Sequence, residues 1–119
     1  MERPADEKCL FCRLVRRALP ASVVAENDEF FAFNDINPQA PHHILVVPKG
    51  HIRSVNELAP EEAALVGRML LFAREIAEDH EFAEPGYRLV LNCGRQAGQS
   101  VDHLHVHMLA GRFLGWPPG

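Results

Sequence analysis

The most informative stretch of this sequence lies near its end and reads His103-Leu104-His105-Val106-His107-Met108-Leu109. Histidines and apolar residues alternate strictly here, and a β-strand turns successive side chains to opposite faces of its sheet. The pattern therefore predicts a final strand with three imidazoles on one face and the apolar residues in the core. A single histidine is usually a surface or core residue, but three at this spacing indicate a functional group.

Outward from this stretch, hydrophobic periodicity predicts short strands and two helices. Apolar spacing favours a short helix over 10–18, ended by Pro20, and a long helix over 60–80. Further strands are expected at 22–26, 30–34, 43–48 and 87–92, the first two forming a hairpin. Hairpin-like strands interrupted by one long helix favour an α+β fold, with helices packed on an antiparallel sheet.

Length and composition limit the possible classes of protein. The 119 residues suit one domain, expected over 9–119, with a flexible tail at 1–8. The net charge of −4 gives no sign of a nucleic-acid surface. No apolar run approaches the roughly 20 residues of a membrane span, and the polar start does not resemble a signal peptide. An odd number of cysteines, three, argues against a disulfide framework and favours a cytoplasmic address.

A glycine-containing loop leads directly into the histidine stretch and carries Gly94, Gly98, Gln99 and Ser100. Glycine lets backbone N–H groups approach a phosphate, and glutamine and serine add neutral donors. A neutral imidazole is nucleophilic toward phosphorus near pH 7. The loop therefore favours phosphoryl chemistry, although three strand histidines could also bind a catalytic metal ion.

A second motif near the start of the chain is the C-x-x-C pair Cys9 and Cys12. At this spacing two thiolates reach one tetrahedral Zn²⁺. A redox pair is an alternative, but redox C-x-x-C usually opens the helix of a βαβ unit, which is not evident here. Two unrelated cysteines are the third interpretation. Cys93 is interpreted as a packed residue, because no adjacent histidine lowers its pKa.

Several motifs, in the right order, resemble the histidine-triad superfamily. The 103–109 stretch matches its signature, 34–41 resembles its nucleoside-pocket loop, and 43–52 resembles its next strand and turn. Within that superfamily, 98–101 and the terminal Trp-Pro-Pro-Gly at 116–119 resemble the HINT branch. The resemblance implies a HIT-like fold: a five-stranded antiparallel sheet with one long and one short helix, extended to ten strands across a homodimer. It also implies hydrolysis of the P–N bond of purine nucleoside 5′-phosphoramidates.

The resemblance further implies roles for individual residues. His105 would be the nucleophile on the α-phosphorus, with His43 and His107 in a hydrogen-bond relay and Ser100 assisting the leaving amine. The remaining nucleotide-binding residues would be Phe11, Asp35, Ile36, Asn92, Gly98, Gln99, Val101 and Trp116, the last approaching the partner subunit's site. Without the resemblance, an aspartate placed like Asp35 is more typical of an Asx-turn.

In some relatives a structural zinc lies at matching positions. The resemblance therefore implies structural zinc at Cys9, Cys12, His51 and His103, and no metal in the chemistry. Two other functions stay open: a dinucleoside polyphosphate hydrolase of the same superfamily, and a nucleotide-binding scaffold with little turnover. The expected partners are a purine nucleotide, AMP or GMP conjugates, and a second copy of the chain, with no nucleic acid or membrane. His42 has no explanation from the sequence.

Overall fold

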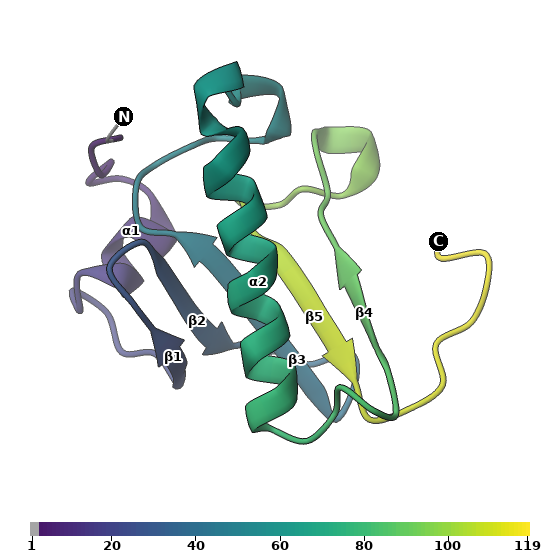
Figure 1. The fold of residues 1–119 in the computed structure, drawn as a ribbon. Coiled ribbons are helices and arrows are strands. Elements are labelled where there is room, and N and C mark those ends of the chain that lie inside the picture. Colours follow the sequence, from purple (N-terminus) through teal and green to yellow (C-terminus); the bar gives the residue numbers. More distant parts are fainter. Residues whose placement is uncertain (1–2) are drawn as a thin grey trace.

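The computed structural model describes residues 3–119, and its centre is one five-stranded antiparallel sheet in the order β1-β2-β3-β5-β4 (Figure 1). The strands are β1 (Val23–Glu26), β2 (Phe30–Asn34), β3 (His42–Pro48), β4 (Tyr87–Val90) and β5 (Val106–Ala110). The expected α+β fold with five antiparallel strands is confirmed. Residues 1 and 2 of the expected tail lie outside the described residues.

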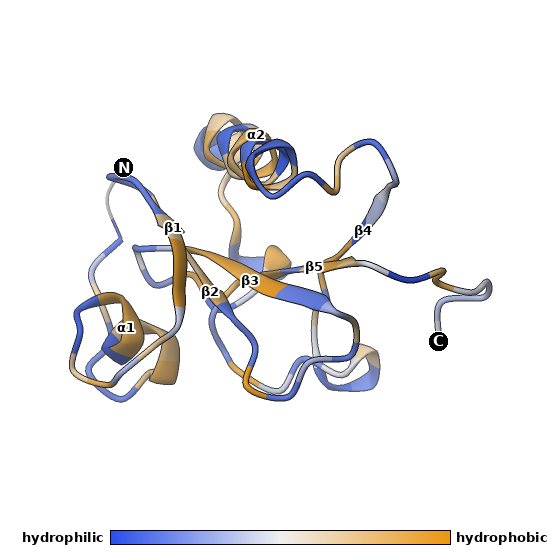
Figure 2. Cartoon of the chain, turned by 90° about the horizontal axis from the view of Figure 1, so that it is seen from below, coloured by the Kyte–Doolittle hydropathy of each residue, from blue (hydrophilic) through white to orange (hydrophobic). Residues whose placement is uncertain are grey.

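Two helices lie on opposite faces of the sheet, as Figure 2 shows from its edge. The long helix α2 (Ala63–Asp79) buries Met69, Phe72 and Ile76 against one face, and the short helix α1 (Leu10–Val15) buries Phe11 against the other. Strand residues alternate between these two cores, as a period of two requires. No helix within residues 3–119 has the length and apolar character to cross a membrane.

The start of α2 also anchors the start of the chain. A 3₁₀ turn, Pro60–Glu62, precedes the helix, and the carboxylate of Glu62 accepts a hydrogen bond from the backbone N–H of Ala59 at 2.8 Å. The buried carboxylate of Glu62 also pairs with the guanidinium of Arg3, at 2.7 Å. A buried carboxylate needs such a partner, so this pair holds the N-terminal segment against the domain.

Element boundaries differ from the sequence prediction in two places near the histidines. Helix α1 ends at Val15 rather than at 18, because Arg17 takes a left-handed backbone conformation with φ 65°. The last strand begins at Val106 rather than at 103. The backbone N–H of Leu104 bonds the carbonyl of Ile52 instead, at 2.6 Å, so His103 and His105 precede the strand.

The structure also accounts for His42, which the sequence left unexplained. Its ring packs on the ring of Phe82, with 5.0 Å between the centroids. Phe82 belongs to the core on the α2 face. His42 therefore lies on the opposite side of the sheet from its neighbour His43, and its role is packing.

Candidate active site and metal centre

The histidines and the apolar residues of 103–108 point to opposite faces of the sheet, as predicted. Leu104, Val106 and Met108 are buried in the core under α2. On the other face the ring of Phe11 meets the rings of His105 and His103 edge-on, at centroid distances of 5.1 and 5.9 Å.

The three histidines nevertheless have different partners. The side chain of His103 contacts cysteines, and that of His107 contacts His43, while His105 bonds a backbone carbonyl. Among the described residues, His103 and His107 belong to two separate groups of possible metal ligands, and His105 belongs to neither. The ring nitrogens of the three histidines are therefore not gathered into one group of possible ligands, as the alternative of a shared catalytic metal ion would require.

A backbone carbonyl fixes one proton of the His105 ring on Nδ1. Its Nδ1 lies 2.7 Å from the carbonyl oxygen of His103. A carbonyl only accepts hydrogen bonds, so Nδ1 carries the proton. The Nε2 of the neutral ring then keeps a free lone pair, as a nucleophile requires.

His43 and His107 are joined by hydrogen bonds in which Nδ1 of each ring accepts, whereas Nδ1 of His105 donates. The backbone N–H of Gln39 donates to Nδ1 of His43 at 3.0 Å, so the proton of the neutral His43 ring sits on Nε2. That Nε2–H lies 2.9 Å from Nδ1 of His107 and donates to it. The proton of His107 is then on its own Nε2. A continuous hydrogen-bond chain therefore runs from Gln39 through both rings.

Burial keeps both rings of this chain neutral. It lowers the pKa of His43, against the opposing effect of the Asp35 carboxylate. Burial, together with the positive charge that His105 and His43 would carry, lowers the pKa of His107 to about 4. At neutral pH the chain therefore carries protons without a net charge.

Asp35 serves two contacts at once. Its Oδ1 accepts the backbone N–H of Asn37 at 2.8 Å, which is the Asx-turn that the sequence suggested. Its Oδ2 lies 3.4 Å from Nε2 of His43. The next residue, Ile36, is fully exposed. The loop after β2 thus places a carboxylate against the His43–His107 pair.

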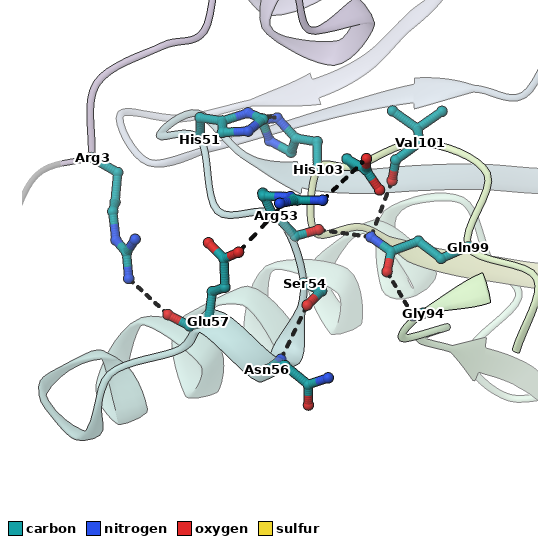
Figure 3. A network of polar contacts seen from close by, with 11 residues as sticks. Arg3, His51, Arg53, Ser54, Asn56, Glu57, Gly94, Gln99, Val101 and His103 are labelled. Atoms are coloured by element: carbon teal, nitrogen blue, oxygen red, sulfur yellow. Dashed lines mark hydrogen bonds and ion pairs between the residues drawn. The ribbon is translucent and has the colours of Figure 1, made fainter. Parts of the chain in front are cut away.

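The loop before the histidines is held by the side-chain amide of Gln99 (Figure 3). Its Nε2 donates to the carbonyls of Arg53 and Val101 at 2.7 and 3.1 Å, and its Oε1 accepts the N–H of Gly94 at 2.9 Å. The amide is thus occupied by the protein's own backbone. Gly98, with φ 89°, ends the short turn Arg95–Ala97 that this loop contains.

The other predicted site residues lie around this loop or at the surface. Ser100 is exposed and lines a hollow of about 570 Å³, together with Val101. Val101 also packs against the core under α1, and Asn92 is half-buried just after β4. Trp116 is 83% exposed in the single chain, so the histidines and Trp116 are not brought together within it.

Cys9, Cys12, His51 and His103 converge as the C-x-x-C motif suggested. Their ligand atoms all lie within 4.8 Å of one another. The Cys9 Sγ–His103 Nδ1, Cys12 Sγ–His51 Nδ1 and His51 Nδ1–His103 Nδ1 distances are 3.3, 3.5 and 3.3 Å. Tetrahedral zinc with two sulfur and two nitrogen ligands at normal bond lengths separates its ligand atoms by about 3.3–3.8 Å. The four residues therefore fit a zinc ion.

Hydrogen bonds around this cluster also suit a metal. Nε2–H of His103 donates to the carbonyl of Pro48 at 2.8 Å, which leaves its Nδ1 free to ligate. Each sulfur accepts a backbone N–H at 3.4 Å, Cys9 from Cys12 and Cys12 from Asp6. Burial raises the pKa of the Cys12 thiol to about 11, despite the lowering effect of the Asp6 N–H. A bound cation would be needed to stabilise the thiolate at neutral pH.

The groups that sequence reasoning missed are backbone atoms. The carbonyls of Pro48 and His103 and the N–H of Gln39 decide which nitrogen of each ring carries the proton. Every residue except proline carries both kinds of group. No residue-type pattern could therefore have identified them.

Comparison with known proteins now identifies the family. The family model for the scavenger mRNA decapping enzyme C-terminal binding domain matches residues 8–115. An uncharacterised HIT-like protein of Synechococcus elongatus is 48% identical over 114 residues, or 96% of this chain and 99% of that protein. The chain belongs to the histidine-triad family.

Other histidine-triad proteins agree in sequence and in fold. The purine nucleoside phosphoramidase of Escherichia coli K12 is 45% identical over 109 residues, or 92% of each protein. The solved HIT family hydrolase of Legionella pneumophila superposes with a TM-score of 0.92 at 43% identity, covering 94% of this chain and all of that one. The resemblance drawn from the histidine-triad motifs is confirmed.

Proposed function

We propose that this histidine-triad protein hydrolyses the P–N bond of nucleoside 5′-phosphoramidates through a nucleotidyl intermediate on His105. The observation that carries the proposal is the bond from Nδ1–H of His105 to the carbonyl of His103, which leaves Nε2 as a free nucleophile. The phosphoramidase named among its relatives supports the substrate class.

The reaction is a double displacement. Nε2 of His105 attacks the α-phosphorus, and the P–N bond breaks. The leaving nitrogen takes the bonding electron pair and one proton, supplied through the hydroxyl of Ser100, while Nε2–H of the neutral His107 donates a hydrogen bond to a non-bridging phosphoryl oxygen. Water then breaks the bond between phosphorus and His105. Its hydroxyl goes to phosphorus, and its proton restores the donor.

The surrounding residues would hold the nucleotide. Ser100 and the backbone of Val101 would donate to the phosphate, while the Gln99 amide, already bonded at both ends, holds the loop in place. The purine and ribose would lie against Phe11, Asp35 and Ile36. Contacts from Asn92, Gly98 and Trp116, the last supplied by a partner subunit, complete the proposed site.

The test compares wild type with His105→Ala and His105→Asn on adenosine and guanosine phosphoramidates. Both variants should fold and bind AMP, yet lose at least about 10³-fold in turnover, as expected on removal of a nucleophile. An alkaline quench of wild type should trap the labelled, acid-labile phosphohistidine. Turnover retained by His105→Ala would exclude this mechanism. Faster hydrolysis of diadenosine polyphosphates would favour the other enzyme class, and AMP binding without turnover would favour a scaffold.

We also propose that Cys9, Cys12, His51 and His103 bind a structural zinc ion. The free cysteines and the ligand distances support this assignment. Zinc here would tie the start of α1 to the segments that follow β3 and precede β5, and would take no part in the chemistry. Reduced thiols also support the proposed cytoplasmic address.

A homodimer with a continuous ten-stranded sheet completes the proposal. Strand β4 is an edge of the sheet, and Leu89 on it is 37% exposed. Phe113 and Trp116, in the segment after β5, are also exposed. An unpaired edge beside apolar side chains favours pairing with a second copy. Light scattering should give twice the chain mass for wild type and less for Leu89→Arg; a monomeric wild type would exclude the dimer.

A further inference from the structure

Arg112, just after β5, makes a contact that the proposed chemistry has not used. Its Nε and Nη2 both donate to the carbonyl oxygen of Gln39, at 3.1 and 3.0 Å. The N–H of the same residue donates to Nδ1 of His43. Arg112 thus holds one backbone group of Gln39 while the other backbone group bonds the ring of His43.

We propose that Arg112 is a positioning residue: its guanidinium holds Gln39 so that the Gln39 N–H fixes the tautomer of His43 and, through it, the proton chain to His107. The effect on catalysis rests on the proposed function, while the effect on the tautomer does not.

The loop that carries Gln39 needs an external anchor. Gln39 is exposed, in the segment between β2 and β3. The other side-chain bonds within the loop are local: Asn37 N–H to Asp35 at 2.8 Å, and the Gln39 side chain to the Asn37 carbonyl at 3.0 Å. The base of the loop is tied to β3 by the bond from the Asp35 N–H to the His43 carbonyl, at 2.9 Å. That bond lies four residues before Gln39 and leaves the Gln39 carbonyl to be held by Arg112. The bond from Arg112 to Gln39 links the loop to the segment after β5, 73 positions away in the chain.

The residue before Arg112 brings the two segments together. Gly111 has φ 97°, and a Cβ placed there would lie 2.8 Å from Cβ of Pro41. The chain leaving β5 therefore passes so close to the loop that a side chain would collide with it. Close packing at Gly111 and a forked hydrogen bond at Arg112 act on the same loop.

Loss of the Gln39 N–H bond would alter the proton chain. With the amide withdrawn, the neutral His43 ring could carry its proton on Nδ1. Its Nε2 lone pair would then face the Nδ1 lone pair of His107, 2.9 Å away. Two facing lone pairs repel, so either the hydrogen bond breaks or His107 moves its proton to Nδ1, and in the second case His107 Nε2 no longer carries a proton to donate.

Arg88→Ala is the matched control that separates positioning of His43 by Arg112 from a purely structural role. Arg88 holds the C-terminal segment by donating to the carbonyls of Leu114 and Gly115 at 3.2 and 2.8 Å. Arg88→Ala would loosen that segment without touching Gln39. Arg112→Lys keeps the charge and one donor but loses the fork.

The experiment records long-range ¹H–¹⁵N spectra of the histidine rings in wild type, Arg112→Ala, Arg112→Lys and Arg88→Ala, with His43→Asn for assignment. Wild type should show His43 protonated on Nε2. Arg112→Ala should give a mixture of both tautomers, Arg112→Lys a smaller change, and Arg88→Ala the wild-type pattern. An unchanged His43 in both Arg112 variants, or the same change in Arg88→Ala, would overturn the proposal.

Kinetics on a phosphoramidate then separate this proposal from the proposed function. For Arg112→Ala, kcat should fall about tenfold with KM little changed, as expected when a hydrogen bond to the transition state is weakened and substrate binding is not. A shifted tautomer with unchanged kcat would uphold the link from Arg112 to His43 and refute the catalytic role of the chain.

Discussion

Two clusters of possible metal ligands in this protein each contain two histidines, and the hydrogen bonds of those histidines differ. Cys9, Cys12, His51 and His103 form one, and Asp35, His43 and His107 form the other, each with its ligand atoms within 4.8 Å. The difference lies in the backbone partner. A carbonyl, that of Pro48, accepts a hydrogen bond from His103, whereas an N–H, that of Gln39, donates one to His43.

Whether that backbone partner accepts or donates a hydrogen bond decides whether the ring nitrogen facing the cluster is free to bind a metal ion or carries a proton. The carbonyl takes the proton of His103 and leaves the inward nitrogen free for a metal. The N–H occupies the lone pair of His43 and leaves its inward nitrogen protonated. For His43 to ligate through that nitrogen, its proton would have to move to Nδ1, where the Gln39 N–H already points. Two pairs of histidines therefore differ in what their inward nitrogens can do: one pair fits the proposed metal site, and the other holds a chain of hydrogen bonds.

His105 lies between His103 and His107 in the chain and shares one feature with His103. Like His103, it donates to a carbonyl and keeps a free lone pair. Among the described residues, however, it has no place in either group of possible ligands. A free imidazole nitrogen without other ligands nearby suits attack on phosphorus better than metal binding.

The largest effect is expected from a variant that removes one ligand of the proposed zinc site. Protein purified without chelator should hold about one zinc per chain, and Cys12→Ala should hold almost none, because a closed four-ligand site binds by many kcal/mol. Metal analysis and thermal unfolding measure the loss. Cys93→Ala, outside the cluster, should keep its zinc. A full equivalent in Cys12→Ala would exclude the site.

The next largest effect is expected from a variant that interrupts the hydrogen bonds of His43 and His107 and leaves the proposed zinc site intact. His107→Asn should lower kcat by about 10²-fold, the usual scale for loss of a hydrogen-bond donor to the transition state, with zinc content unchanged. His42→Asn is the matched control, because that ring packs against Phe82 on the opposite face. Loss of zinc in His107→Asn, or an equal loss of kcat in His42→Asn, would mean that the two clusters are not separate.

The smallest effect is on stability as pH falls. Burial lowers the pKa of His43, and it lowers the pKa of His107 to about 4. The unfolded rings titrate near about 6.5, so the unfolded state binds more protons between those values. The free energy of unfolding should therefore fall as pH drops from about 6.5 toward 4, by up to about 1 kcal/mol per pH unit for the His107 ring.

Urea unfolding at a series of pH values checks this dependence. His107→Asn removes one buried ring, so its unfolding free energy should vary less steeply with pH than that of wild type. Equal slopes would show that His107 is not held neutral in the fold.

Periodicity predicted most of the fold because burial dictates it. The hairpin of β1 and β2, the strand β3 and the helix α2 all follow apolar spacing closely. The strand boundary at Val106 could not be predicted, because an extended segment and a paired strand have the same alternation. The tertiary contact from Leu104 to the Ile52 carbonyl made the difference.

The sequence by itself determined which chemical groups are present, their spacing along the chain and, through the motifs, the family. Tertiary structure alone decided which ring nitrogen carries each proton. For His103 that choice depends on a backbone carbonyl far away in the chain, because Pro48 stands 55 residues before it. The backbone partners of His43 and His105 are near in the chain, but the Arg112 guanidinium that holds Gln39 stands 73 residues from it. Since almost every residue offers the same N–H and C=O, only the folded geometry selects the pair that meets a given imidazole.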